Sequence, residues 1–271
     1  MFSRAPLEAP RVIAVVHLPA LPGAPRYDGH LSALFAKART EAVQLEAAGA
    51  DAIIVENFGD TPFFPDVVPP VTVAAMAVVV ADIVRAVRIP VGVNVLRNDV
   101  RAALSVAAVT GAGFVRVNVH AGARVTDQGI LQGKAHETLR ERRLISADHV
   151  SIFADVHVKH SAALAERSIA EEARELNERA AVDAVLVTGG STGAAPDEET
   201  VALVREAVVD TPLYVASGVT PENAASLLRH ADGCIIGSAL KYRGDARREV
   251  DEKRAKEVIS YLKSLSGAEK R

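Results

Sequence analysis

An alternation of short apolar segments with longer helical segments runs through the whole chain, and it limits the possible folds more than any other feature. The short segments are rich in Val, Ile and Ala, as buried parallel strands are. Turns such as Ala48-Gly49-Ala50-Asp51 precede them, because glycine closes a helix and starts the return to the sheet. We expect eight strands, at residues 12–17, 52–56, 91–95, 114–120, 151–157, 184–188, 213–217 and 233–237.

Eight strand–helix units predict a protein of the α/β class with a single (β/α)8 barrel, the TIM barrel. The length of 271 residues is typical of such a barrel, and no change in composition divides the chain. We therefore expect one TIM-barrel domain over residues 1–271. An open, doubly wound parallel sheet shows the same alternation and is the alternative.

The charge balance argues against a nucleic-acid partner. The chain has 31 Lys and Arg against 34 Asp and Glu, a net charge of -3, so no strongly basic face is expected. A small molecule is the better candidate ligand, and any acidic group on it must be bound by a local cluster of donors. We also expect a homo-oligomer.

The sequence predicts a cytoplasmic protein. Cys234 is the one cysteine, which fits a reducing compartment. The first ten residues lack the apolar region of a signal peptide, so we expect none. The most apolar stretch, residues 71–84, is shorter than the roughly 20 residues that span a membrane. We therefore expect no transmembrane segment, although peripheral association with a membrane is compatible with the sequence.

Two connections are longer than closure of a barrel requires. Residues 57–70 contain a Phe pair and four prolines, and residues 121–134 are polar and glycine-rich. Both follow a strand, on the face where such barrels keep their active sites. Each is interpreted either as a lid or as a structural loop.

Polar side chains at alternate positions indicate that one face of several strands carries function, because side chains two residues apart point the same way. Arg116, Asn118 and His120 share one face of the fourth strand, and Asp155 and His157 share one face of the fifth. These sets converge on the mouth of the barrel with the following residues at strand ends: His17, Glu56 or Asn57, Asn94 and Lys159.

The converging residues allow two kinds of chemistry. Glu56, Asp155 and the three histidines could bind a divalent metal ion. The same groups serve as general acid and base without a metal, the reading that we favour, so the cofactor stays undefined. A Schiff-base mechanism is less favoured because no predicted strand contains a lysine, and Lys159 is the one strand-adjacent candidate.

The loops after the last strands resemble a barrel phosphate site. The seventh strand runs into Ser217 and Gly218, and the eighth runs into Gly237 and Ser238. Thr220 with Pro221 is expected to start a helix, whose N-terminus favours an anion. Thr188 and Gly189, after the sixth strand, could extend the site to a second polar group. The alternative is that these glycines only allow tight turns.

With these residues in view, the chain resembles the BtpA/SgcQ family of barrel proteins along almost its whole length. The resemblance implies the same barrel mouth, and it adds Arg97, Asn98, Thr126, Asp127 and Gln128 as lining residues. The blocks that carry it are VVHLPALPGAP (15–25), ENFGDTPF (56–63), GVNVLRND (92–99), VRVNVHAGA (115–123), TDQGILQGKA (126–135), ADVHVKH (154–160), VTGGSTG (187–193), SGVTPEN (217–223) and IIGSALK (235–241).

The resemblance implies two functions of different classes. One branch of the family is associated with stable assembly of photosystem I, and another with sugar-metabolism operons and a nucleosidase label. We expect an enzyme that acts on a phosphorylated sugar or nucleotide-like molecule by hydrolysis or isomerisation; the alternative is a non-catalytic assembly factor for a membrane complex. In the enzyme, Asp155 and His157 form the acid–base pair with Glu56 as second carboxylate. The other roles are orientation by His17 and His120, ligand binding by Asn57, Asn94, Arg97, Arg116, Asn118, Asp127, Lys159, Thr188 and Gly189, and a phosphate grip by Ser217, Gly218, Gly237 and Ser238.

Overall fold

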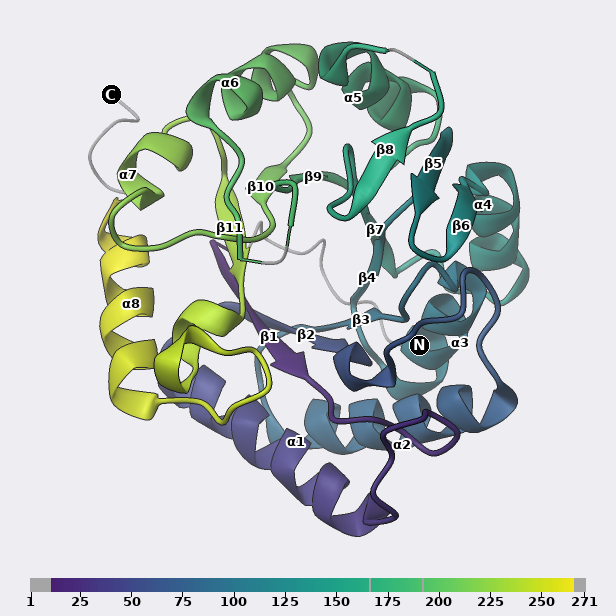
Figure 1. Ribbon diagram of the computed structural model, residues 1–271, viewed down its shortest axis with the longest axis vertical. Coiled ribbons are helices and arrows are strands. Elements are labelled where there is room, and N and C mark those ends of the chain that lie inside the picture. Colours follow the sequence, from purple (N-terminus) through teal and green to yellow (C-terminus); the bar gives the residue numbers. More distant parts are fainter. Residues whose placement is uncertain (1–10, 166, 192, 266–271) are drawn as a thin grey trace.

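Parallel strands close into a barrel in a computed structural model that describes residues 11–165, 167–191 and 193–265. The expectation about the first ten residues and the Thr192 position of the glycine-rich block lie outside these ranges. The closed order confirms the TIM barrel and rejects the open sheet (Figure 1). Around the barrel the strands are β1 (Val12–His17), β2 (Ala52–Glu56), β3 (Val91–Asn94), β4 (Phe114–Val117), β7 (Ser151–Asp155), β9 (Ala184–Val187), β10 (Leu213–Val215) and β11 (Gly233–Ile236), which pairs with β1.

Helices form a ring outside the strands (Figure 1). Several start where the sequence supplies a cap: the Asp99 and Asp197 side chains accept from the third backbone N–H that follows, and Ser168 forms a capping box with Glu171. No helix within the described ranges has the length and apolar character needed to cross a membrane. The helices are α1 (Leu31–Ala47), α2 (Pro70–Ala86), α3 (Val100–Thr110), α4 (Ala135–Leu144), α5 (Ile169–Glu178), α6 (Glu198–Ala207), α7 (Ala224–Leu227) and α8 (Glu252–Ser264), with short 3-10 helices η1 (Phe58–Asp60), η2 (Ser238–Leu240) and η3 (Tyr242–Gly244).

An apolar plug fills the part of the barrel below the mouth. The rings of Phe114 and Phe153 stack with centroids 4.9 Å apart, and Tyr214 continues the stack at 5.5 Å. Gly92 makes room for the plug, since a Cβ there would lie 2.2 Å from the Phe114 ring. The next inward positions of β3, β4 and β7 are the polar residues Asn94, Arg116 and Asp155, whereas that of β10 is Ala216. Alternation thus places a polar layer directly above the plug on three of these strands.

The two long connections have different structures. Residues 57–70 contain η1 and lead into α2, with Pro70 at its start. The other connection is not an irregular loop but a hairpin of β5 (Ala123–Thr126) and β6 (Gly129–Gln132). β8 (Ser161–Ala163) pairs with the free side of β5, which makes a three-stranded antiparallel sheet beside α4 and α5 (Figure 1).

Candidate active site

Three strand ends form one row of side chains at the mouth of the barrel. The parallel register aligns His17 with Glu56 and Glu56 with Asn94. Asn94 Nδ2 donates to Glu56 Oε2 at 2.7 Å, and both residues are buried. Burial alone would raise the pKa of Glu56, but the surrounding groups, including His17 and Lys159, lower it overall. Glu56 is therefore a fixed carboxylate at neutral pH.

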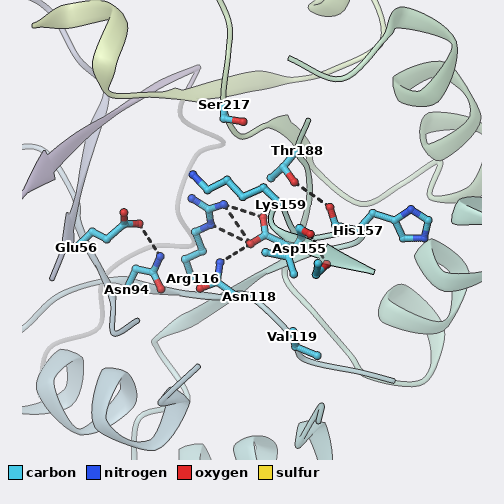
Figure 2. A network of polar contacts seen from close by, with 12 residues as sticks. Glu56, Asn94, Arg116, Asn118, Val119, Asp155, His157, Lys159, Thr188 and Ser217 are labelled. Atoms are coloured by element: carbon cyan, nitrogen blue, oxygen red, sulfur yellow. Dashed lines mark hydrogen bonds and ion pairs between the residues drawn. The ribbon is translucent and has the colours of Figure 1, made fainter. Parts of the chain in front are cut away.

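A buried ion pair lies beside this row (Figure 2). Arg116 Nη2 lies 2.9 Å from Asp155 Oδ1, and its Nε lies 3.2 Å from Oδ2. Asn118 Nδ2 donates to the same Oδ2 at 2.7 Å. Burial alone would lower the pKa of Arg116, but the neighbouring carboxylates raise it above the ordinary arginine value. Both carboxylate oxygens of Asp155 accept hydrogen bonds from these donors. Asp155 therefore positions Arg116 and is poorly placed to transfer protons.

Lys159 and Arg97 complete the charged layer. Arg97 Nη2 donates to the Lys159 backbone oxygen at 2.6 Å. The Lys159 side chain runs across the mouth, and its amine ends on the Glu56 side of Asp155 (Figure 2). Burial, followed by the charge of Arg116, lowers the pKa of Lys159 below the ordinary lysine value.

These charged groups share a cavity of about 310 Å³. The apolar wall of the cavity is formed by Phe58, Phe63 and Leu96. These residues were not predicted as part of the site, although the Phe pair in residues 57–70 was noted in the sequence. Asp127, from the β5–β6 turn, reaches the rim of the cavity. The lining residues are Glu56, Phe58, Thr61, Phe63, Leu96, Arg97, Arg116, Asn118, Asp127, Lys159 and His160.

The structure does not bring His120 and His157 to the mouth, which corrects the expected acid–base constellation. β4 ends at Val117 and β7 at Asp155, so side-chain alternation no longer holds at these histidines. His120 Nε2 lies 3.1 Å from the Ala180 oxygen, outside the barrel wall, and burial lowers its pKa to about 4. His157 points away from Asp155 (Figure 2), with Nε2 3.4 Å from Glu172 Oε2.

His17 stays at the end of β1 but lies in a second pocket. Its ring contacts Phe58 edge to face, with centroids 4.8 Å apart, and it lines a cavity of about 440 Å³ on the α1 side. Burial lowers the pKa of His17 to about 3, an effect that Glu56 only partly offsets. His17 is therefore a neutral imidazole.

Several predicted lining residues hold loops together instead. Asn57 accepts from the Leu96 N–H at 2.7 Å, and Asn98 exchanges two hydrogen bonds with Val119 at 2.9 Å. Thr126 accepts from the Gln128 N–H and so shapes the hairpin turn. These amides and hydroxyls are used within the protein.

Some buried charged residues were not predicted from the sequence. Arg124 Nε donates to Ser161 Oγ at 3.1 Å, and Nη1 lies 3.4 Å from Glu172, which fastens the accessory sheet to α5. Lys241 and Glu41 form a buried ion pair of 2.9 Å between α1 and η2. Their sequence contexts, a hairpin strand and a helix face, gave no signal for burial.

The glycines after the sixth to eighth strands allow close packing. A Cβ on Gly189 would lie 2.3 Å from the Ala194 oxygen, one on Gly218 2.2 Å from the Ala195 nitrogen, and one on Gly237 2.3 Å from the His17 ring. Ser217 Oγ donates to Ala194 O at 3.0 Å, and Thr188 Oγ1 donates to His157 O at 2.8 Å. The tight-turn interpretation of these glycines therefore has direct support.

The expected helix start at Thr220 is wrong. The Thr220 N–H donates to Asn223 Oδ1 at 2.8 Å, and α7 begins only at Ala224 and ends at Leu227. Such a short helix offers little dipole. The backbone still has donors to offer, because no hydrogen bond between described residues uses the N–H of Gly218, Val219 or Ser238.

The candidate metal ligands are dispersed. Within the described ranges, no three His, Cys, Asp or Glu side chains come together in a way that could hold a metal ion. The outward positions of His120 and His157 account for this, since they remove two members of the expected set.

Barrel closure, the polar layer and the mouth cavity define a TIM-barrel protein with room for a small ligand. Solved barrels share this fold at low identity. Thiamine phosphate pyrophosphorylase from Pyrococcus furiosus matches with a TM-score of 0.59 and 16% identity over 95% of this chain and 97% of that chain. N-(5'-phosphoribosyl)anthranilate isomerase from the same organism matches with a TM-score of 0.57 and 16% identity, covering 94% and 98%.

The chain belongs to the BtpA family, whose model matches residues 8–264. The photosystem I biogenesis protein BtpA of Synechocystis sp. is 42% identical over 93% of this chain and 87% of its own length. An uncharacterized protein of Methanocaldococcus jannaschii is 41% identical over 98% of both chains. The family resemblance of the sequence blocks is thereby confirmed.

Proposed function

We propose that the protein is an enzyme that binds a phosphorylated sugar or nucleotide-like molecule at the barrel mouth and acts on it by acid–base chemistry. The observation that carries this proposal is the charged layer of the 310 Å³ cavity. Arg97, Arg116 and Lys159 face the buried carboxylates of Glu56 and Asp155 and the exposed carboxylate of Asp127 at the rim, and Asp155 is already neutralised by Arg116. Within the cavity, Arg97 and Lys159 are therefore the charged donors that an anionic group of a ligand can meet.

The phosphate group would lie toward the ends of β10 and β11. The unused N–H groups of Gly218, Val219 and Ser238 are donors that a phosphate can accept. Loops after the seventh and eighth strands are the usual phosphate-binding elements of TIM barrels. This placement would leave the sugar or base over the cavity of Glu56 and Lys159.

Glu56 is the proposed acid–base residue. It is buried and held in one orientation by Asn94, and no ion pair of the described residues neutralises it. A positioned carboxylate of this kind can move a proton in an isomerisation or activate water in a hydrolysis such as a nucleosidase reaction. Asp155, in contrast, would act through Arg116, as a positioning residue.

Thermal unfolding against a panel of sugar phosphates, nucleosides, nucleotides and inorganic phosphate tests the proposal, because selective binding to the native state raises the Tm. Every ligand that raises the Tm is then followed by NMR for turnover. Glu56→Gln should keep the Tm shift and lose turnover by at least about 100-fold, whereas Glu206→Gln, an exposed carboxylate on α6, should change neither. Full turnover by Glu56→Gln would remove Glu56 from the chemistry.

A second candidate function, assembly of a membrane protein complex, is favoured by a groove away from the mouth. The groove of about 980 Å³ lies between α2, α3 and α4. Val67 and Leu144 line it and are 72% and 78% exposed. Exposed apolar surface of this kind often marks a protein interface, and a relative carries the name photosystem I biogenesis protein.

The oligomeric state, measured by light scattering, shows whether this groove joins copies of the chain or is free to bind a different protein. We also propose a homo-oligomer, and Val67→Asp combined with Leu144→Asp should dissociate it if the groove joins copies of the chain. An oligomer that survives the double substitution would leave the groove free for a different protein and would favour the assembly function. Arg143→Asp, at an exposed ion pair near the end of α4, is the control for added surface charge.

A further inference from the structure

Lys159 is a partly buried amine without a bonding partner among the described residues. No hydrogen bond or ion pair between the described residues uses its Nζ, although Arg97 fixes its backbone oxygen. The side chain lines the mouth cavity together with Glu56 and Arg116. An ammonium group that is partly removed from water and has no partner is held at a cost in stability, so the position calls for a functional explanation.

Lys241 shows what a structural buried lysine looks like in the same protein. Its side chain is 1% exposed, and its Nζ lies 2.9 Å from Glu41 Oε2, whose side chain is 4% exposed. The charge of Lys241 is thus neutralised by one carboxylate, outside the mouth. Lys159 has no such ion pair with a described residue, and it lines a cavity that a ligand can enter.

The surroundings of Lys159 shift its titration toward the neutral amine. Burial lowers its pKa, and the guanidinium of Arg116 lowers it further; Glu56 and Asp155 oppose this effect without cancelling it. A larger fraction of this amine is therefore nucleophilic near neutral pH than of an exposed lysine. The sequence disfavoured a lysine mechanism because Lys159 lies beyond the predicted strand interior, but the residues that follow β7 return its side chain to the mouth.

We propose that Lys159 forms an imine with the carbonyl carbon of an aldehyde or ketone sugar phosphate bound at the mouth. The inference rests on the proposed function, since the same cavity must first bind the phosphorylated ligand. It narrows the substrate class to compounds with a free carbonyl group, or to cyclic sugars that open to one.

The step balances without any further reagent. Nζ of the neutral amine attacks the carbonyl carbon, and an N–C bond forms while the C=O π electrons move to oxygen. Nζ gives up two protons in all, and the carbonyl oxygen receives two and leaves as water, so that C=N replaces C=O. Glu56, across the cavity, is placed to accept a proton from Nζ and return it to that oxygen.

Borohydride trapping on the full chain tests the inference. The protein is incubated with ribose 5-phosphate, glyceraldehyde 3-phosphate or dihydroxyacetone phosphate, each with and without sodium borohydride, and intact mass and peptide maps are recorded. We expect one reduced adduct, located on Lys159, with any of the three that raises the Tm. Glycerol 3-phosphate, which lacks a carbonyl group, should give none.

Two controls separate trapping from general lysine chemistry. Lys159→Arg keeps the positive charge and should bind the same ligands with a similar Tm shift, but it should lose the adduct. Lys241, as a buried lysine outside the mouth, should remain unlabelled in the wild type.

Each remaining outcome has a definite meaning. A Tm shift without an adduct on Lys159, or with adducts spread equally over exposed lysines, would overturn the imine and leave the proposed function standing. No Tm shift with any phosphorylated ligand would overturn the proposed function and the imine with it.

Discussion

The guanidinium of Arg116 and the carboxylate of Asp155 form a two-point ion pair inside the barrel, with side chains only 4% and 0% exposed. The pair lies directly above the stacked rings of Phe114 and Phe153, at inward positions of the same strands. Charges at this depth are tolerated only when they are paired and hydrogen-bonded. The pair therefore fixes the floor of the cavity in which Glu56 and Lys159 lie.

Removing Asp155 should cost far more stability than removing a surface carboxylate. Asp155→Ala leaves the buried Arg116 charge without its partner, and we expect the free energy of unfolding to fall by about 3–5 kcal/mol. Asp148→Ala, at an exposed ion pair with Arg143, should cost less than about 1 kcal/mol. Urea denaturation measures both, and equal losses would contradict the assigned role of the buried pair.

The buried Lys241 and the partly buried Lys159 should respond in opposite ways to replacement by methionine. Lys241→Met leaves Glu41 buried and unpaired, so we expect a loss of about 3–5 kcal/mol. Lys159→Met removes a partly desolvated charge that has no bonding partner among the described residues, so stability should stay unchanged or rise by up to about 2 kcal/mol. Thermal and urea unfolding of both variants give the comparison. A large loss in Lys159→Met would show that Lys159 is a structural residue.

The close packing of Gly237 against the His17 ring should make glycine necessary for stability at position 237, whether or not a ligand is bound. An added Cβ would meet the His17 ring at 2.3 Å, so Gly237→Ala should destabilise the protein by about 1–3 kcal/mol. His17→Ala in the same chain removes the clash and should restore part of the loss. Gly190→Ala is the matched control, because nothing lies within 4 Å of a Cβ there. Additive losses in the double variant would refute this packing relationship.

Stability should fall in mild acid because buried histidines resist protonation. The pKa of His120 drops from 6.5 to about 4 on burial, so the unfolded state binds more protons between these pH values. This contribution is complete above pH 6.5 and is lost as the pH falls toward 4, with a slope of up to about 1.4 kcal/mol per pH unit.

Replacing His120 by Gln should flatten this dependence, because an amide can still donate to Ala180 O but does not titrate. The free energy of unfolding is measured by urea titration at pH 4 to 7 for the wild type, His120→Gln and His136→Gln. His136 has a 70% exposed side chain, and its variant should follow the wild type. Parallel curves for wild type and His120→Gln would disprove this origin of the acid sensitivity.

Local sequence patterns predicted the barrel well, because each strand is a short apolar segment that can be recognised without knowledge of the rest of the chain. β1 and β2 begin and end where the apolar runs do. The predictions failed where chain direction changes: His120 and His157 follow strands that end two or three residues earlier than expected. A pattern with period two carries no information on where the strand itself stops.

The electrostatic character of the mouth depended on contacts that are remote in sequence. Lys159 and Arg97 are 62 positions apart, and their bond exists only because two loops meet over the barrel. The partial burial of Lys159 follows from that packing, which no local spacing encodes. The hairpin at residues 123–132 likewise gained its third strand from residues 161–163.

Hydrogen exchange with a bound ligand tests most directly the claim that the barrel mouth is the functional site. The ligand is the sugar phosphate that raises the Tm most among ribose 5-phosphate, glyceraldehyde 3-phosphate and dihydroxyacetone phosphate. The account predicts slower exchange in peptides covering residues 56–63, 155–160 and 217–219, and unchanged exchange in residues 67–78 and 138–144 of the outer groove. Protection confined to the outer groove, or no protection with any of the three, would contradict it.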